Sequence, residues 1–183
     1  MNIEIITPPA AEPLELNDVL DALRIDHGTR DAEVTRLIQA GRECAEHEAG
    51  IYVMPQVVRL TADSWPDDLC IRLGPVRSVV SVSYWDGNAW VVVPDTSYVG
   101  YRRNGSYHID PVIAWPSLGT LPGDRIRVDL NVGYATAGAV PACVKTFIVA
   151  QVGAWAENPE AAGQQLEVNP LLCRLLEPVS TYA

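Results

Sequence analysis

The apolar run that follows Pro141 constrains the fold more than any other part of this 183-residue chain. Between residues 142 and 156 only four positions are not apolar, and Lys145 is the only charged one. A helix of this composition buries most of its circumference. At about 17 residues, with a lysine inside, it is too short for a membrane span, which needs roughly 20 apolar residues. The run therefore predicts the central helix of a soluble core, or a helix shared between subunits.

The residues before this run predict how the chain enters the helix. Residues 125–132 alternate polar and apolar with period two, as a half-buried strand does. Gly133 and Gly138 then mark a loop of small residues. Pro141 suits the first helical position, where its missing N–H is not needed. The expected order is strand, loop, proline and buried helix.

Two further helices are expected in the first third of the chain. The first, at about 16–25, has its apolar residues on one face. The second, at about 31–50, repeats apolar residues at the i, i+3, i+4, i+7 spacing of a helix. Asp31 or Thr29 is expected to cap its start, and Gly50 fits its C-terminal end.

The period changes to two between residues 56 and 132, which predicts six to eight strands. Proline pairs separate the strands, and Asp86-Gly87-Asn88 matches the chemistry of a tight hairpin turn. Residues 1–14, by contrast, hold three prolines between positions 8 and 13. Because proline bars regular structure, this segment is expected to be extended and irregular.

The last part of the sequence predicts a linker and a short apolar helix. Residues 159–168 have too little apolar content to pack by themselves, and Asn169-Pro170 offers a cap followed by proline in the first turn. A helix of about two turns follows and is marginal alone, so it must dock on something. Its apolar stripe consists of Leu171, Leu172, Leu175 and Leu176.

Common catalytic and phosphate-binding motifs are missing from the sequence. The nearest approach to a metal site is Cys44, His47 and Glu48, which share one helical face and would supply half of such a site. A packed cysteine beside solvated polar residues explains them better. His27 and His108 lie in unrelated elements, so the sequence predicts no metal site, no cofactor and no catalytic residues.

Three other polar groupings have structural explanations that are preferred here. Asp26-His27 followed by Asp31 fits a turn between helices better than acid–base catalysis. Asp67-Asp68 fits an acidic turn between strands better than a cation site. Arg102-Arg103 lies among tyrosines, an arrangement that can bind single-stranded nucleic acid, but one arginine pair fits a loop tip or a subunit contact.

The formal net charge of −10 argues against sequence-independent nucleic-acid binding, because lysine and arginine supply most of that affinity. The four cysteines are widely separated and could form two disulfides, but nothing else in the sequence is typical of a secreted protein. The first residues lack the basic and apolar regions of a signal peptide. A cytosolic protein with reduced cysteines is expected.

Several stretches, taken in order, resemble the head-to-tail connector (adaptor) proteins of long-tailed double-stranded DNA phages. They are Ile-Thr-Pro-Pro-Ala-Ala-Glu-Pro-Leu-Glu-Leu at 6–16, Ala-Leu-Arg-Ile-Asp-His at 22–27, Leu-Ile-Gln-Ala-Gly-Arg-Glu at 37–43, and the strand–loop–proline–helix region ending in Ala-Trp-Ala-Glu-Asn at 154–158. The chain departs from the family at Asn158-Pro159-Glu160, where members often carry a basic residue after the asparagine. Its β insertion is also longer than in the smallest members.

The resemblance implies an α+β fold, a small helical bundle with an inserted antiparallel β-rich region and a C-terminal docking arm. One connector domain would span 1–183, with helical parts at 15–52 and 141–157, the β insertion at 56–132 and the arm at 159–183. Phe147, Ile148 and Trp155 on the 141–157 helix are the expected core or subunit-contact residues. The four leucines of the arm are the expected contacts to a partner.

The function implied by the resemblance is that of a non-enzymatic virion protein of a phage or gene-transfer particle. Adaptors of this family form a ring, implied to be dodecameric, at the head–tail junction. The ring joins the portal protein to a tail-side connector or stopper protein and extends the conduit used for genome ejection. It would assemble in the host cytoplasm, let DNA pass through its channel without specific binding, and contact no membrane. The alternative is a monomeric binding module, or a small enzyme, with a ligand pocket in the β-rich region.

Overall fold

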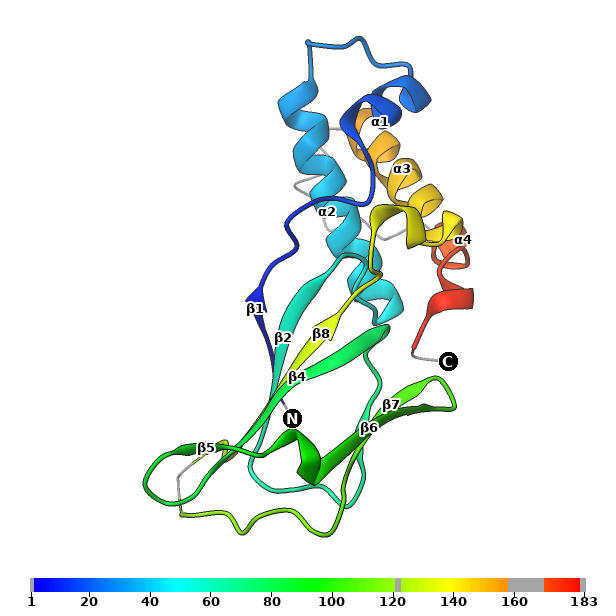
Figure 1. Cartoon of the computed structure of the whole chain (residues 1–183). Helices are drawn as coiled ribbons and strands as arrows, with labels where there is room; N and C mark the ends of the chain where they lie inside the picture. The colour runs from blue at the N-terminus through cyan, green and yellow to red at the C-terminus, as the bar shows by residue number, and fades with distance from the viewer. Residues whose placement is uncertain (1, 121–122, 158–169, 182–183) are drawn as a thin grey trace. The chain divides into compact units, whose positions relative to one another are not determined.

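The computed structural model describes residues 2–120, 123–157 and 170–181 and divides into two compact units (Figure 1). One unit, the β unit, comprises the residues up to Pro9 together with Pro55–Gly133. The other, the helical unit, comprises Ala10–Met54 and the residues from Tyr134 onward. The predicted α+β class, with helices and an inserted antiparallel β-rich region, is confirmed.

Three helices form most of the helical unit: α1 (Leu16–Leu23), α2 (Asp31–Ala49) and α3 (Ala142–Glu157). All three pack against one another, as predicted. A Cβ atom at Gly41 of α2 would lie 3.1 Å from Cγ2 of Ile148 on α3, so the glycine allows the two helices to approach closely. The core that they enclose contains Val19, Leu20, Val34, Ile38, Ala45, Ala49, Val144, Phe147, Ile148 and Val152.

The turn between α1 and α2 corrects the predicted helix cap. Neither Thr29 nor Asp31 caps α2, whose N-cap residue is Arg30 without a side-chain cap bond. Instead, the Asp31 carboxylate accepts a hydrogen bond from the backbone N–H of Gly28, and the Thr29 hydroxyl donates to the carbonyl of Asp26. Both polar side chains therefore stabilise the turn itself. At the other end of α2, Gly50 is left-handed (φ 64°), as predicted.

A five-stranded antiparallel sheet forms the larger part of the β unit, in the order β1-β2-β8-β4-β5. Its strands are β1 (Asn2–Thr7), β2 (Gln56–Ala62), β4 (Val76–Trp85), β5 (Trp90–Val92) and β8 (Ile126–Val132). The predicted Asp86 turn joins β4 to β5, and its carboxylate accepts the N–H groups of Asn88 and Ala89. The prediction of an irregular segment over residues 1–14 is wrong for Asn2–Thr7, which form β1, and is confirmed for residues 8–14, where the prolines lie.

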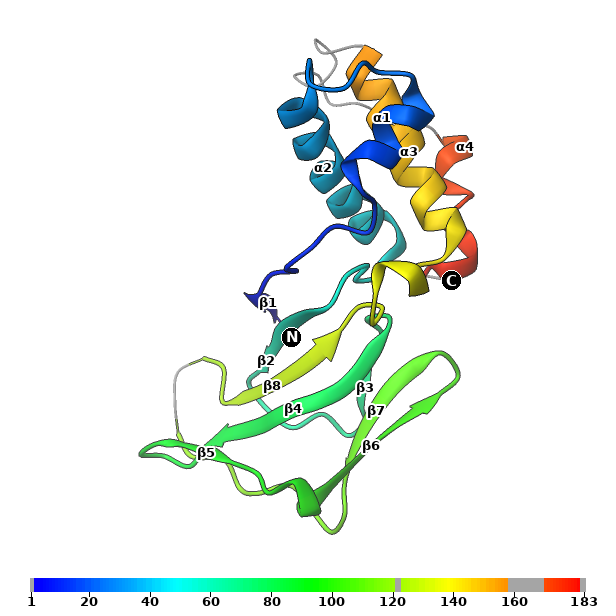
Figure 2. The ribbon, with the colours of Figure 1, turned by 45° about the horizontal axis from the view of Figure 1, so that its top comes forward.

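A second antiparallel sheet has the order β3-β7-β6 (Figure 2). Its strands are β3 (Leu69–Ile71), β6 (Tyr98–Arg103) and β7 (Ser106–Pro111), and the turn between the last two contains Asn104 and Gly105, both with positive φ. The Arg102 guanidinium donates a hydrogen bond to the carbonyl of Val76, which links this sheet to β4.

The large sheet has one apolar and one polar face. On β2, Val58 and Leu60 are buried, and on β8 every second residue is buried in the same way. On the opposite face Arg59 forms a bidentate ion pair with Asp129, at 2.8 and 2.9 Å. Among the residues that the structure describes, no helix has the length and apolar content needed to cross a bilayer.

Candidate assembly surfaces

The first expected surface, on α3, is mostly internal to the chain. Phe147 and Ile148 are fully buried in the helical core, whereas Trp155 is half-buried. The exposed positions of α3 carry small or polar residues, among them Ala142 and Thr146. Of the two alternatives for this helix, a core position is therefore observed for Phe147 and Ile148, and a subunit contact at Trp155 stays a prediction.

The expected docking leucines are placed on the helical unit as far as they are described. Leu176 is 2% exposed within the helical core, and Leu172 and Leu175 are half-buried against the same core. The side chain of Leu171 and the predicted linker 159–168 lie outside the described residues. The three described leucines of the stripe thus pack on their own chain, and the role of the stripe in docking to a partner stays a prediction.

Hydrogen bonds fasten the C-terminal segment, which contains α4 (Pro170–Cys173) and the 3-10 turn η4 (Glu177–Val179), to the end of α2. The N–H of Thr181 donates to the carbonyl of Ala49, and its hydroxyl donates to the carbonyl of Gly50. These carbonyls are among those that a helix leaves unpaired at its C-terminus. An open hollow of about 300 Å³ lies here, and its lining is Glu48, Cys173, Arg174, Leu176, Glu177 and Ser180.

Among the described residues, the large exposed apolar side chains are confined to the β unit. The large ones are Ile3, Ile5, Ile6, Val80, Val92, Val99, Tyr101, Val112 and Ile113. Single exposed apolar residues are normal, but three isoleucines together on one strand are not explained by the single subunit. The sequence analysis missed these residues because it treated the N-terminal segment as irregular.

Two isoleucines of β1, Ile3 and Ile5, extend the apolar face of the large sheet beyond its core. Ile3 is paired with Leu60, and Ile5 is paired with Val58. Cross-strand partners point to the same side of a sheet, so Ile3 and Ile5 continue the buried face of β2. Their exposed fractions are nevertheless 49% and 52%, because β1 is the edge strand. An apolar face that ends uncovered at a free edge suits pairing with another chain.

Charged groups near the end of α2 are buried and paired. The Arg42 guanidinium, nearly inaccessible to solvent, contacts Glu12 and Glu46 at 2.8 Å and Glu43 at 3.4 Å. Glu46 also accepts a hydrogen bond from the backbone N–H of Val53. Burial is the largest influence on Glu46 and raises the pKa of its carboxyl, while Val53 and Arg42 act in the opposite direction. This cluster fixes the chain as it leaves α2.

Cys44, His47 and Glu48, for which the sequence favoured a packed cysteine beside solvated polar residues over a metal site, are placed on α2. His47 is solvent-exposed, and its closest charged partner is Glu48 at 3.7 Å. The Cys44 thiol is half-buried, and burial together with Glu48 and Cys173 raises its pKa to about 11. Cys44, His47 and Glu48 therefore do not converge on one point. Within the described residues, the only His, Cys and carboxylate group close enough to hold an ion is Asp68, Cys70 and His108, which the sequence analysis left apart.

The other sequence candidates are structural. His27 pairs with Asp21 at 2.9 Å across the α1–α2 turn. Arg102 is bound to Val76, as described above, and Arg103 is exposed next to the β6–β7 turn. No arrangement of these residues provides a catalytic group with its own base or nucleophile.

Comparison with known proteins gives matches only among solved structures. No family model matches the chain, and no curated protein matches it. A chain from the "neck of empty GTA particle computed with C6 symmetry" aligns with a TM-score of 0.81 and 19% identity. A chain from the virion of a native gene transfer agent (GTA) particle aligns with a TM-score of 0.80 and 18% identity. A chain from the neck of a native GTA particle computed with C12 symmetry aligns with a TM-score of 0.79 and 17% identity.

This chain has the fold of those neck and virion chains. Each alignment covers 98% of this chain and 95% of the other, so both the helical and the β regions are included. At 17–19% identity the likeness establishes the fold, and the function is a separate question.

Proposed function

We propose that this protein is a structural component of the neck of a phage or gene-transfer particle. In this role it forms a ring adaptor between the portal and a tail-side connector. The observation that carries the proposal is the fold match with neck chains over 98% of this chain and 95% of theirs.

The ring is proposed to form through the β unit. Similar chains come from necks computed with C6 and C12 symmetry, which supports a cyclic homo-oligomer of twelve copies. In a cyclic ring each subunit presents two different surfaces, one to each neighbour. The uncovered apolar edge formed by Ile3 and Ile5 on β1 is one of these surfaces, with a neighbouring copy as its occupant. Covering it removes apolar area that the single chain leaves in water.

The net charge of −10 fits a conduit through which DNA passes without adhering. Carboxylates repel phosphates over about one Debye length, roughly 8 Å at physiological salt. A ring with acidic residues toward its channel would let DNA slide, whereas a basic lining would bind it.

The segment with α4 and η4 is the proposed contact to the portal. Leu176 anchors this segment in the helical core, so the contact would use the groups that stay accessible beside it. Arg174 and Glu177 are exposed there and line the hollow next to Glu48. A polar hollow beside half-buried leucines offers both charge and apolar area to a partner segment.

Assembly of the purified protein with its portal tests the ring. We expect rings at the portal by electron microscopy and a matching mass by sedimentation velocity. Ile3→Lys combined with Ile5→Lys should leave a folded monomer that forms no ring. Asn2→Lys is the matched control. Asn2 lies on the same strand as Ile3 and pairs with Thr61 of β2, but its side chain is on the opposite face of the sheet from Ile3. A wild-type protein that stays monomeric with portal would contradict the proposed function.

A charge exchange tests the portal contact separately from folding. Arg174→Glu with Glu177→Arg should preserve stability and rings but weaken attachment to the portal, measured by co-sedimentation. Truncation after Asn158 is less informative, because it also removes the core residue Leu176. Normal attachment of the charge-exchanged protein would show that this surface has no docking role.

A further inference from the structure

The outer face of the three-stranded sheet carries a row of chemically active side chains. Cys70 on β3 is the register partner of His108 on β7, and His108 is the register partner of Tyr101 on β6. The neighbouring residues Leu69 and Ile109 point to the other face and are buried. Strand pairing thus places a thiol, an imidazole and a phenol side by side on the less buried face of this sheet.

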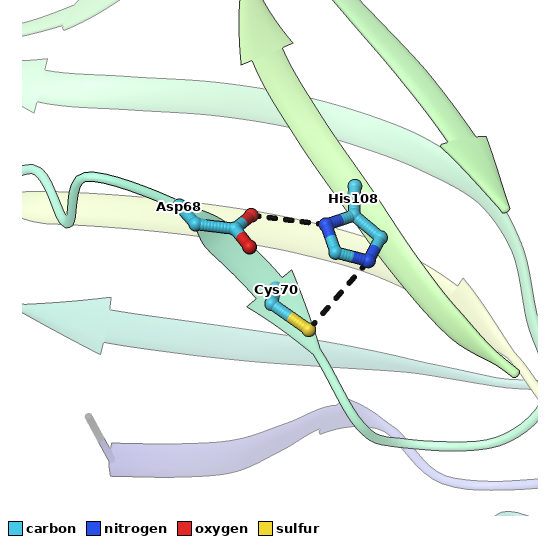
Figure 3. A group of neighbouring side chains, drawn as sticks. All are labelled: Asp68, Cys70 and His108. Atoms are coloured by element: carbon cyan, nitrogen blue, oxygen red, sulfur yellow. Dashed lines mark hydrogen bonds and ion pairs between the residues drawn. The ribbon is translucent and has the colours of Figure 1, made fainter. Parts of the chain in front are cut away.

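The His108 ring is held in a fixed orientation. Its Nδ1 lies 2.9 Å from Oδ1 of Asp68, and its face stacks on Tyr101 with 5.5 Å between ring centroids (Figure 3 shows the Asp68 contact). The Tyr101 hydroxyl in turn donates to Asp110 at 2.6 Å. The side chain of His108 is 12% exposed and that of Asp68 is 61% exposed. The ring is therefore packed while its carboxylate partner faces water.

The contact with Asp68 decides which ring nitrogen is free. An ionised carboxylate only accepts hydrogen bonds, so Nδ1 of a neutral His108 must carry the proton. Nε2 then presents its lone pair, and Figure 3 shows this nitrogen directed at Cys70. Its distance to the Cys70 sulfur is 3.8 Å. A neutral imidazole whose other nitrogen donates to a carboxylate is the usual form of a metal-binding histidine.

The spacing of the two donor atoms matches that of two ligands on one ion. With Zn–N near 2.1 Å and Zn–S near 2.3 Å, a tetrahedral zinc ion separates its nitrogen and sulfur ligands by about 3.6 Å. The observed 3.8 Å needs an adjustment of only a few tenths of an ångström. One ligand atom each from Asp68, Cys70 and His108 already lies within 4.8 Å of the others.

We propose that Cys70 and His108 bind one Zn²⁺ ion through Sγ and Nε2, with Asp68 orienting the imidazole. Thiolate and imidazole together select zinc over magnesium or calcium, which prefer oxygen ligands. Binding replaces the thiol proton, which passes to solvent, with a Zn–S bond. Water completes the coordination, so the site is open and exchangeable. This proposal is independent of the proposed role in the neck.

Cobalt titration of the full chain tests the site, because thiolate-bound Co²⁺ gives a charge-transfer absorption in the near ultraviolet. We expect one equivalent of Co²⁺ to bind and Zn²⁺ to displace it. Cys70→Ser should abolish the charge-transfer band and His108→Ala should abolish binding. Asp68→Asn should weaken binding about 10- to 100-fold, as loss of an orienting partner does. Absence of the band, or its persistence in Cys70→Ser, would overturn the proposal.

Two control variants separate the site from nonspecific binding. Cys143→Ser removes another half-buried cysteine, and His27→Gln removes another histidine paired with an aspartate. Neither should change the titration. Protection of Cys70 from iodoacetamide by Zn²⁺, read by mass spectrometry of the wild-type protein, is a second measurement that needs no variant. Equal rates of Cys70 alkylation with and without Zn²⁺ would overturn the metal site. Turnover of an activated ester by a protein that binds no metal would also overturn it and would identify Cys70 as a reactive nucleophile.

Discussion

The helical unit and the β unit differ in how far they bury their large apolar side chains. The helical unit gathers them into one core that includes residues from α1, α2, α3 and the C-terminal segment. The β unit buries one face of its large sheet but leaves nine large apolar side chains exposed. A chain that belongs to an assembly can thus keep one part self-sufficient and leave the other to be completed by neighbours. The predictions below test this division.

The largest expected effect is in the helical core. Phe147→Ala should lower the free energy of unfolding by about 3–5 kcal/mol, because Phe147 is fully buried and its removal leaves a cavity. Chemical denaturation would measure the change. Ala154→Ser on the exposed side of α3 is the control and should have little effect. If Phe147→Ala lowered the free energy of unfolding by less than about 1 kcal/mol, the helical core would not be self-sufficient, and the two units would not differ in this way.

A somewhat smaller effect is expected for Leu176→Ala. If the C-terminal segment is part of the core, as the 2% exposure of Leu176 indicates, the substitution should lower the free energy of unfolding by about 2–4 kcal/mol. Equilibrium denaturation of the isolated subunit is the measurement, with Arg174→Ala as a nearby exposed control. If Leu176→Ala leaves stability unchanged but disrupts portal binding, the leucines serve the partner and the helical unit is smaller than the structure indicates.

Ile5→Ala should lower the free energy of unfolding of the isolated subunit by only about 1 kcal/mol. Full burial of an isoleucine side chain is worth roughly 1.5–3 kcal/mol, and Ile5 is about half exposed. If β1 is the proposed ring interface, the same change should lower stability more in the assembled protein than in the isolated subunit. Thermal unfolding of monomer and ring at equal buffer conditions compares the two. An equal effect in both states would mean that β1 is not an interface.

The smallest effect is a pH dependence from Glu46. Its pKa is raised from the ordinary value of 4.5, chiefly by burial, so the folded chain holds this proton more tightly than the unfolded chain does. Its contribution to stability therefore falls as pH rises from about 4.5 through the folded pKa. Wild-type stability relative to Glu46→Gln should decline over that window.

Glu33→Gln provides a control of opposite sign for the Glu46 measurement. The hydrogen bond from Arg30 is the largest influence on Glu33 and lowers its pKa. The contribution of Glu33 to stability is therefore present above its unfolded pKa and is lost as pH falls. If wild-type stability relative to Glu46→Gln rose with pH as it does relative to Glu33→Gln, Glu46 would not be buried in the way described.

Sequence reasoning predicted the local features well and the long-range ones poorly. Helical periodicity gave α1 and α2 to within a few residues, the apolar run after Pro141 gave α3, and the Asp86 turn followed from local chemistry. Strand β1 was missed although Asn2, Ile3, Glu4 and Ile5 alternate, because the prolines after it dominated the interpretation. Its partner β2 lies more than fifty residues away, and no local signal reports that pairing.

The candidate surfaces show the same limit. The apolar composition of α3 was read correctly, but the composition does not say whether its own chain or a neighbour covers it. His108 and Cys70 are 38 residues apart, so only the register of β3 with β7 brings them together. A cysteine and a histidine in separate strands are a weak signal until the pairing is known.

The division of the chain has a consequence for its synthesis. The helical unit is built from two segments that are separated in the sequence by residues 55–133 of the β unit. The Arg30 side chain donates a hydrogen bond to the carbonyl of Ala156, 126 positions later. About 90 residues separate the end of α2 from the start of α3, which a ribosome adds in roughly 5–20 seconds. For that time α1 and α2 have no third helix to cover Leu20 and Ile38. The helical unit can therefore complete its core only after α3 has emerged from the ribosome.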